Sequence, residues 1–328
     1  MMMPSSQTIS PVVIGCAGKT LSADEVALFS DYNPWGLILF NRNLDDSAQI
    51  KALIAQFQEA VGRKNAPIFI DQEGGRVQRL RPPLSPDFMA MGEIGTLYQK
   101  QPEEAIALLQ TTITALSMPL KKLGINANCA PVADLRLEAM HEVIAMRSFS
   151  HDPDICKFLA DIAMRTFIEN GIAPILKHVP GYGRVKSDPH HFLPYIDAPL
   201  EQLEQSDFIP FQKLLHAPAM MSAHIIIEAI DAHYPATQSR LIMHHLIREK
   251  WGYDGLLITD DIMMEALAGS VCERACASLK AGNDIILHCS GDFTQMQELF
   301  QAVAPFPSSV QSQKRMMNFE HIYSLREY

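Results

Sequence analysis

Short apolar runs alternate with longer amphipathic segments along the whole chain. Several of these runs are hydrophobic throughout, as expected for strands that are buried on both faces of a parallel sheet. Most are bounded by glycine, proline or charged residues, which favour turns and loops. The pattern predicts eight strands, at residues 12–16, 36–40, 67–71, 128–133, 174–178, 219–224, 255–260 and 284–288.

The segments between the predicted strands have the periodicity of helices. In residues 47–61, apolar side chains such as Ile50, Leu53 and Phe57 recur at spacings of three and four, which places them on one face of a helix. Ser22 is the expected N-cap of an earlier helix, because Glu25 follows it at the spacing of a capping box. Similar apolar stripes predict further helices at 103–123, 154–170, 200–216, 240–250, 273–281 and 293–303.

Eight strand–helix units in a chain of 328 residues indicate the α/β class and a TIM-like (β/α)₈ barrel. An open, doubly wound sheet of this length would normally divide into two domains, and no linker-like stretch separates two halves here. We therefore expect one barrel domain over residues 1–328. A short C-terminal tail begins at about residue 308 and contains one more possible helix, at 311–326.

Ionisable side chains end five of the predicted strands in succession. In a (β/α)₈ barrel the C-terminal ends of the strands meet at one mouth, where the active site lies. The pattern therefore predicts a polar pocket, although a polar residue can also simply mark the end of a strand. His224 could equally be a core histidine, and Asp261 could be a helix N-cap. Glu73, two residues beyond the third predicted strand, could be structural or catalytic. The residues at the strand ends are Asp71, Asp134, Lys177, His178, His224, Asp260 and Asp261.

The residue types indicate an acid–base reaction with a carboxylate nucleophile. Asp260 is the last residue of an apolar predicted strand, so its position is rigid, which suits a nucleophile or a charge stabiliser. His190 lies two residues after Asp188 in a loop rich in glycine and proline, where the carboxylate could orient the imidazole for proton transfer. This combination suits acetal cleavage with retention of configuration. Arg79, Arg147 and Lys177 are candidate donors to the substrate.

Composition narrows the classes of partner. The formal net charge of −10 argues against nucleic acid, which requires a basic surface. No apolar run has the length of a membrane span, and the N-terminus lacks the basic start of a signal peptide. Six cysteines are scattered without a CxxC pair, so we expect free, mostly buried thiols, no zinc pattern and a reducing cytoplasmic location.

Several segments of the chain resemble glycoside hydrolase family 3, and in particular its single-domain bacterial β-N-acetylglucosaminidases of cell-wall recycling. They occur in the family's order and span most of the sequence. The segments are GLILFNRN (36–43), IDQEGGRVQRL (70–80), NCAPVADL (128–135), RSFSHDP (147–153), KHVPGYGRVKSDPHHFLP (177–194), MMSAHI (220–225), YPATQS (234–239) and ITDDIMMEA (258–266).

The resemblance implies a TIM-like barrel that removes terminal β-linked N-acetylglucosamine from peptidoglycan fragments by double displacement. It implies that Asp260 is the nucleophile and that His190 is the acid–base, with Asp188 as its dyad partner. No metal or cofactor is implied, and the partner is a small carbohydrate such as a muropeptide or disaccharide. The residues that match sugar-binding positions are Asp71, Arg79, Arg147, Lys177 and His178.

Three alternatives remain open on the sequence. The chain has Tyr182 and Pro189 where the family pattern has histidine and serine, which keeps a catalytically impaired sugar-binding protein in consideration. The same fold could act on another β-glycoside, such as a glucoside or xyloside. A metal-dependent barrel hydrolase would instead use His178, Asp188, His190 and His224 as ligands.

Overall fold

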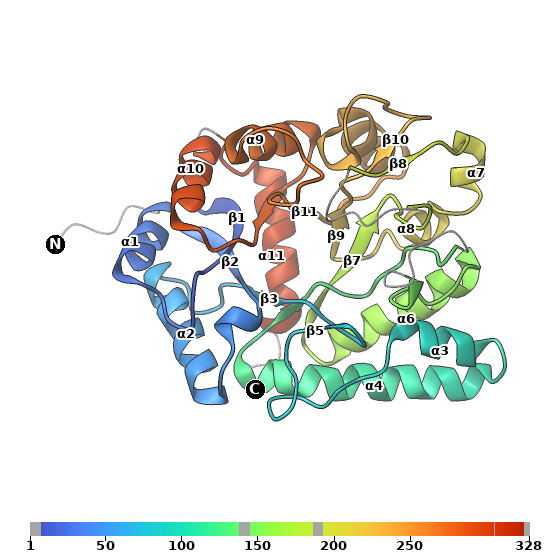
Figure 1. The fold of residues 1–328 in the computed structure, drawn as a ribbon, viewed down its shortest axis with the longest axis horizontal. Helices are drawn as coiled ribbons and strands as arrows, with labels where there is room; N and C mark the ends of the chain where they lie inside the picture. Colours follow the sequence, from blue (N-terminus) through green and yellow to red (C-terminus); the bar gives the residue numbers. More distant parts are fainter. Residues whose placement is uncertain (1–7, 138–144, 186–192, 305, 325–328) are drawn as a thin grey trace.

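The strands form a closed, parallel eight-stranded barrel surrounded by helices (Figure 1). The computed structural model describes residues 8–137, 145–185, 193–304 and 306–324. Each barrel strand overlaps one predicted strand, so the predicted α/β barrel is confirmed. In order around the barrel the strands are β1 (Ser10–Gly15), β12 (Ile285–His288), β11 (Leu256–Asp261), β9 (Ala219–Ser222), β7 (Ala173–Val179), β6 (Ala127–Asn128), β3 (Ile68–Ile70) and β2 (Pro34–Leu39).

The helices follow the predicted apolar stripes. Ser22 caps the first helix, and its side chain and that of Glu25 form the expected capping box. The helices are α1 (Ala23–Tyr32), α2 (Ser47–Ala60), α3 (Met91–Tyr98), α4 (Pro102–Leu123), α6 (Pro153–Glu169), α7 (Leu200–Glu204), α8 (Ile209–Lys213), η3 (Leu241–Lys250), α9 (Val271–Ala281), α10 (Phe293–Val303) and α11 (Val310–Ser324), with short 3₁₀ turns η1 (Asn41–Asn43) and η2 (Ala236–Gln238).

Two helix predictions are wrong in detail. The segment 200–216 is not one helix but two short ones, α7 and α8, because Pro210 lacks the N–H that would bond to the Ser206 carbonyl in a continuous helix, whereas the first turn of α8 tolerates this loss. Most of the segment 240–250 is a π-helix, η3 (Leu241–Lys250), the helix type in which an N–H bonds to the carbonyl five residues back. The Trp251 N–H continues this pattern and donates to the Leu246 carbonyl at 2.9 Å.

The sequence pattern missed helix α3 and two small sheets. Gly92 and Gly95 disfavour a helix in isolation, but a Cβ at Gly95 would collide with the Phe149 carbonyl, so tertiary packing requires glycine there. One small sheet pairs β4 (Gln72–Gly74) with β5 (Val77–Gln78), and the other pairs β8 (Tyr195–Ile196) with β10 (Ile226–Ile227).

The C-terminal helix α11 closes the N-terminal end of the barrel. Figure 1 shows it, in red, across the middle of the ring of strands. Phe319 is fully buried and packs on Trp35 and Phe69, with ring centroids 5.5 and 5.9 Å apart. The Trp35 indole N–H donates to the Glu320 carboxylate at 2.6 Å. Small side chains at the starts of three strands leave room for these rings, namely Ala127, Ala173 and Ala219.

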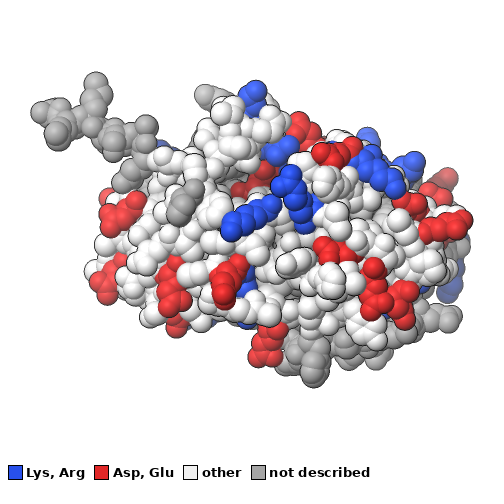
Figure 2. All heavy atoms as spheres, turned by 90° about the horizontal axis from the view of Figure 1, so that it is seen from above, with Lys and Arg blue, Asp and Glu red and all other residues white. Residues whose placement is uncertain are grey.

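Charge on the surface is mixed. On the face shown in Figure 2, acidic side chains are scattered, and basic ones form a short row among the described residues rather than a broad patch. No helix of the described residues is long and apolar enough to cross a membrane.

We expect Phe319→Ala to destabilise the protein by about 3–5 kcal/mol, because it removes a buried ring from a packed aromatic cluster and leaves a cavity. Chemical denaturation monitored by circular dichroism measures this loss. Met317→Ala is the matched control, since that side chain lies on the same helix and is 68% exposed. Equal stability of the two variants would contradict a structural role for α11.

Candidate active site

The polar residues of the five strand ends gather at the C-terminal mouth of the barrel. Asp71 follows β3, Lys177 and His178 belong to β7, and Asp260 lies at the end of β11. Buried Cys129, beneath them, has a pKa raised first by burial and then by the negative charge of Asp71, with a smaller contribution from Asp260. The two carboxylates therefore act on one thiol from different strands, as the sequence predicted for a shared pocket.

A continuous chain of ion pairs forms one wall of this mouth. Lys177 Nζ lies 3.1 Å from Asp71 Oδ1 and 2.7 Å from Glu73 Oε1. Arg147 donates to both oxygens of Glu73, through Nε at 2.8 Å and Nη2 at 2.7 Å. Arg79 Nη2 donates to Asp71 Oδ2 at 3.0 Å. The network links four of the five predicted sugar-binding residues through Glu73, which the sequence left undecided between a structural and a catalytic role.

All members of this network that have shifted pKa values favour their charged forms. Burial alone would raise the pKa of Glu73, but Arg147 and Lys177 outweigh it and hold that pKa at about 2. Burial likewise opposes ionisation of Asp71, yet Lys177 and Arg79 keep its pKa below the usual value. Burial would lower the pKa of Lys177, but the two carboxylates raise it. Three cations and two anions leave an excess of one positive charge.

Arg79 has an N–H donor that is not used within the described residues. Its guanidinium lies over the Phe40 ring, 5.2 Å from the centroid. Its Nε is buried and has no hydrogen-bond partner among the described residues. Its side chain is partly exposed, like that of Arg147. These two arginines therefore present cationic groups at the edge of the pocket.

His178 is buried as a neutral imidazole beside Asp134, which is buried as well. Burial, together with Arg147 and Lys177, lowers its pKa well below the usual range. Its Nδ1 lies 2.6 Å from Asp134 Oδ2, and burial raises the pKa of Asp134 well above its usual value, so the pair shares one proton between Nδ1 and Oδ2. The His178 backbone has φ = 140°, an unfavourable value for a residue other than glycine.

Asp134 also anchors the loop that leaves β7. Its other carboxylate oxygen accepts the Tyr182 N–H at 2.8 Å. Gly183 approaches Leu135 so closely that a Cβ would lie 2.5 Å from the Leu135 carbonyl oxygen. The loop therefore starts from a rigid base. Asp188, His190 and the neighbouring Pro189 and His191 lie outside the described residues.

The two aspartates that end β11 have different surroundings. Asp261 Oδ1 accepts the backbone N–H groups of Met263 and Cys289, each at 3.0 Å. Burial, with a smaller contribution from Asp260, raises the pKa of Asp261 to about 6. Asp260 is half-buried, and its Oδ1 accepts the Asp261 N–H at 2.8 Å. The interpretation of Asp261 as a helix N-cap is wrong, because its carboxylate closes a turn and residues 262–269 contain no helix.

His224 supports the backbone of this corner. It is 1% exposed, and burial lowers its pKa. Its Nε2 lies 3.0 Å from the Asp261 carbonyl oxygen, which can only accept, so Nε2 carries the proton. The buried Nδ1 then has a lone pair and no partner among the described residues. His224 is therefore a core histidine whose hydrogen-bonding capacity is satisfied at Nε2 but not, within the described part of the chain, at Nδ1.

The described residues provide no ligand set for the alternative of a metal-dependent hydrolase. His178 uses its Nδ1 for Asp134 and His224 uses its Nε2 for a carbonyl, and Asp188 and His190 lie in the undescribed segment. All six cysteines are free, and four of them are buried, as expected.

Sequence reasoning named Glu73 and Asp134 but gave neither a defined role. Glu73 occupies the centre of the ion network, and Asp134 holds both His178 and the start of the loop. The sequence signal for both residues was their position, one or two residues beyond the end of a predicted strand. Only the contacts show that each joins two separate segments.

Known proteins with similar sequences and structures agree on one family. Residues 6–324 match the family model described as the glycosyl hydrolase family 3 N-terminal domain. A protein from Bordetella pertussis named β-hexosaminidase is 34% identical over 312 residues, covering 94% of this chain and 88% of its own length.

Solved structures give the same relationship. A family 3 β-N-acetylglucosaminidase from Paenibacillus sp. FPU-7 is similar with a TM-score of 0.86 and 29% identity, over 97% of this chain and 62% of that one. NagZ from Neisseria gonorrhoeae, in complex with N-trifluoroacetyl-D-glucosamine, has a TM-score of 0.79 and 27% identity, over 96% of this chain and 98% of that one. The chain therefore belongs to glycosyl hydrolase family 3 and is a glycosidase built on the family's N-terminal barrel.

Proposed function

We propose that the protein is a retaining β-N-acetylhexosaminidase that removes terminal, non-reducing β-linked N-acetylglucosamine. The observation that carries this proposal is the charged wall of the mouth, in which Asp71, Arg79, Lys177 and Arg147 lie around one pocket with the Asp260 carboxylate. The name of the Bordetella relative and the glucosamine derivative bound by the Neisseria protein support the N-acetyl sugar.

Asp260 is the better nucleophile of the aspartate pair. Asp261 has one oxygen occupied by two backbone N–H groups, and its raised pKa of about 6 disfavours the anion that must attack. Asp260 is only partly buried, and within the described part of the chain its carboxylate accepts one backbone N–H, that of its neighbour Asp261. This supports the assignment of the first aspartate in ITDDIMM.

The reaction proceeds in two displacements. An oxygen of the Asp260 carboxylate bonds to the anomeric carbon while the bond to the leaving oxygen breaks, and His190 gives that oxygen a proton. His190, oriented by Asp188, then takes a proton from water as the water oxygen bonds to the anomeric carbon and releases Asp260. Two inversions give net retention.

The ion network would hold the sugar by hydrogen bonds to its hydroxyl and acetamido groups. Asp71 and the two arginines have partly exposed side chains, whereas that of Lys177 is only 3% exposed. We assign contact with the outer hydroxyls to Arg79 and Arg147, and one inward-facing hydroxyl to the Asp71–Lys177 pair. His178, with Nδ1 engaged by Asp134, leaves Nε2 for a hydrogen bond to the sugar.

We infer that the natural substrate is a peptidoglycan fragment in the cytoplasm. Six free thiols suit a reducing compartment. The partly exposed cationic groups at the mouth also suit a substrate that carries carboxylates beyond the sugar, as muropeptides do.

The first test compares p-nitrophenyl β-glycosides of N-acetylglucosamine, glucose and xylose, each with and without a chelator. We expect hydrolysis of the N-acetyl substrate at least ~10-fold faster than the other two and no effect of the chelator, because proton transfer and the nucleophile are both supplied by side chains. A preference for glucoside or xyloside would reassign the substrate, and loss of activity with chelator would revive the metal alternative.

Asp260→Asn should reduce kcat by at least ~10³-fold while leaving the circular dichroism spectrum unchanged, because the amide cannot form the glycosyl intermediate. Asp261→Asn should retain much more activity, since its amide oxygen can still accept both backbone N–H groups. Asp31→Asn, on an exposed position, is the control. The opposite ranking of the two active-site variants would transfer the nucleophile to Asp261.

His190→Ala should slow substrates with poor leaving groups far more than activated phenyl glycosides, because only the poor leaving group needs a proton as it departs. The measurement is kcat/KM across a series of leaving-group pKa values, which should become steeper in the variant. An equal loss for every leaving group would mean that His190 only shapes the loop.

A further inference from the structure

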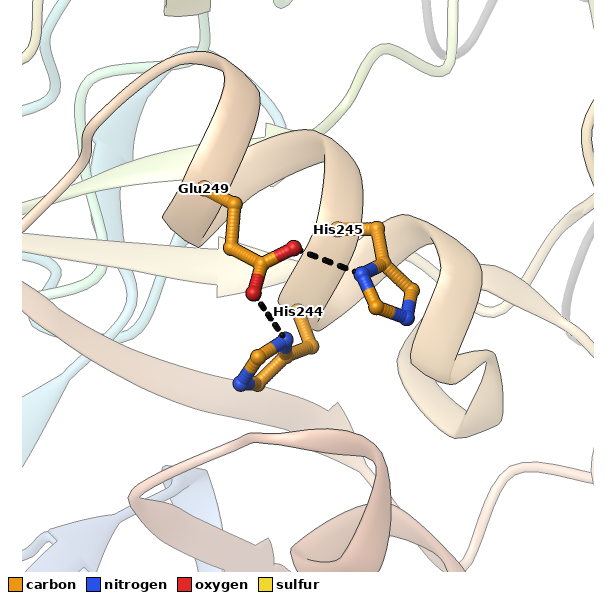
Figure 3. Close-up of side chains that lie close together, drawn as sticks. All are labelled: His244, His245 and Glu249. Atoms are coloured by element: carbon orange, nitrogen blue, oxygen red, sulfur yellow. Dashed lines mark hydrogen bonds and ion pairs between the residues drawn. The ribbon is translucent and has the colours of Figure 1, made fainter.

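A second cluster of ligating side chains lies on helix η3. Figure 3 shows His244, His245 and Glu249 converging on the outer face of this helix. Glu249 Oε2 lies 2.6 Å from His245 Nδ1, and Glu249 Oε1 lies 3.4 Å from His244 Nδ1. One donor atom from each residue falls within 4.8 Å of the other two, which no other trio of such side chains achieves among the described residues.

The π-helical backbone creates this arrangement. In an α-helix, positions 244 and 249 would differ by about 140° around the axis, so Glu249 could approach only His245. With hydrogen bonds to the fifth preceding residue a turn holds about 4.4 residues, so Glu249 falls between the two imidazoles, within about 50° of either. The Trp251 N–H donating to Leu246 at 2.9 Å shows that this register holds at the end of the helix.

The donor set suits a borderline divalent cation. Two imidazole nitrogens and one carboxylate oxygen are ligands that zinc and its neighbours prefer, whereas calcium and magnesium prefer oxygen alone. Tetrahedral zinc keeps its ligand atoms about 3.3 Å apart. The separation of His244 Nδ1 from Glu249 Oε1 is already 3.4 Å, and that of His245 Nδ1 from Glu249 Oε2, 2.6 Å, requires only a small movement of the Glu249 side chain.

One ring nitrogen of the trio is unsatisfied. His244 Nδ1 is shielded from solvent and makes no hydrogen bond among the described residues, although its ring is partly exposed. The carboxylate faces it at a distance suited to a shared ion rather than to a direct bond. The three side chains are 40%, 50% and 56% exposed, which leaves room for water as a fourth ligand.

The cluster lies away from the catalytic mouth. His244 borders a cleft of about 570 Å³, whose lining includes Pro11, Asn283 and Asp284 at the starts of β1 and β12. These strand starts are at the N-terminal end of the barrel, opposite the end that carries Asp260. An ion here would therefore not contact the substrate.

We propose that His244, His245 and Glu249 form a surface site for a divalent transition-metal ion of the zinc class. The bound ion links the two histidines to Glu249 and so holds η3 in its π register. The site is independent of the glycosidase reaction.

The test is titration of the metal-free protein with Zn²⁺ by calorimetry and with Co²⁺ by visible absorption, in which tetrahedral cobalt gives intense bands. We expect one ion per chain, with the affinity reduced at least ~10-fold by His244→Ala, His245→Ala or Glu249→Gln. Hydrolysis of the N-acetyl substrate by His245→Ala should stay within about twofold of the unsubstituted protein.

His216→Ala is the matched control. That histidine is similarly exposed and pairs with Asp161 at 2.8 Å, but among the described residues it belongs to no trio of ligating side chains, so its loss should leave the affinity unchanged. No saturable binding up to about 1 mM metal would overturn the proposal. Binding that survives all three substitutions would place the ion elsewhere and overturn it equally.

Discussion

The buried ammonium group of Lys177 is the point on which the catalytic mouth depends. A lysine that is almost fully shielded from water is tolerated only when opposite charges replace its hydration. Asp71 and Glu73 do so from the segment that follows β3, two barrel positions away from β7. Removing either carboxylate would leave the three cations of the network with a single anion, and the buried Lys177 would lose part of the charge compensation that it requires.

This network also explains how a mouth made of separate loops can be rigid. Arg147 reaches Glu73 with a bidentate pair, so the segment around residue 147 is tied to the β3 loop. Asp134 makes the corresponding link between the β6 end and the loop after β7. These buried carboxylates therefore join separate chain segments, and the part of the mouth that they line is fixed before a sugar enters it.

The two ends of the barrel interior are lined by different kinds of side chain. At the N-terminal end, aromatic rings from α11, β2 and β3 fill the interior and exclude water. At the C-terminal end, the same interior ends in charged groups that need partners and a substrate. Helix α11 thus buries the residues at the N-terminal ends of the strands, while the residues at the C-terminal ends remain available for chemistry.

The sequence by itself determined the barrel, because each strand and most helices have a local periodicity that tertiary contacts do not override. It also located the residues at the strand ends, since their spacing from apolar runs is a local property. The central role of Glu73, the π register of η3 and the helix α3 with its two glycines were decided only by tertiary structure. Each depends on atoms that are distant in sequence or on a backbone register that the same amphipathic pattern cannot distinguish from an α-helix.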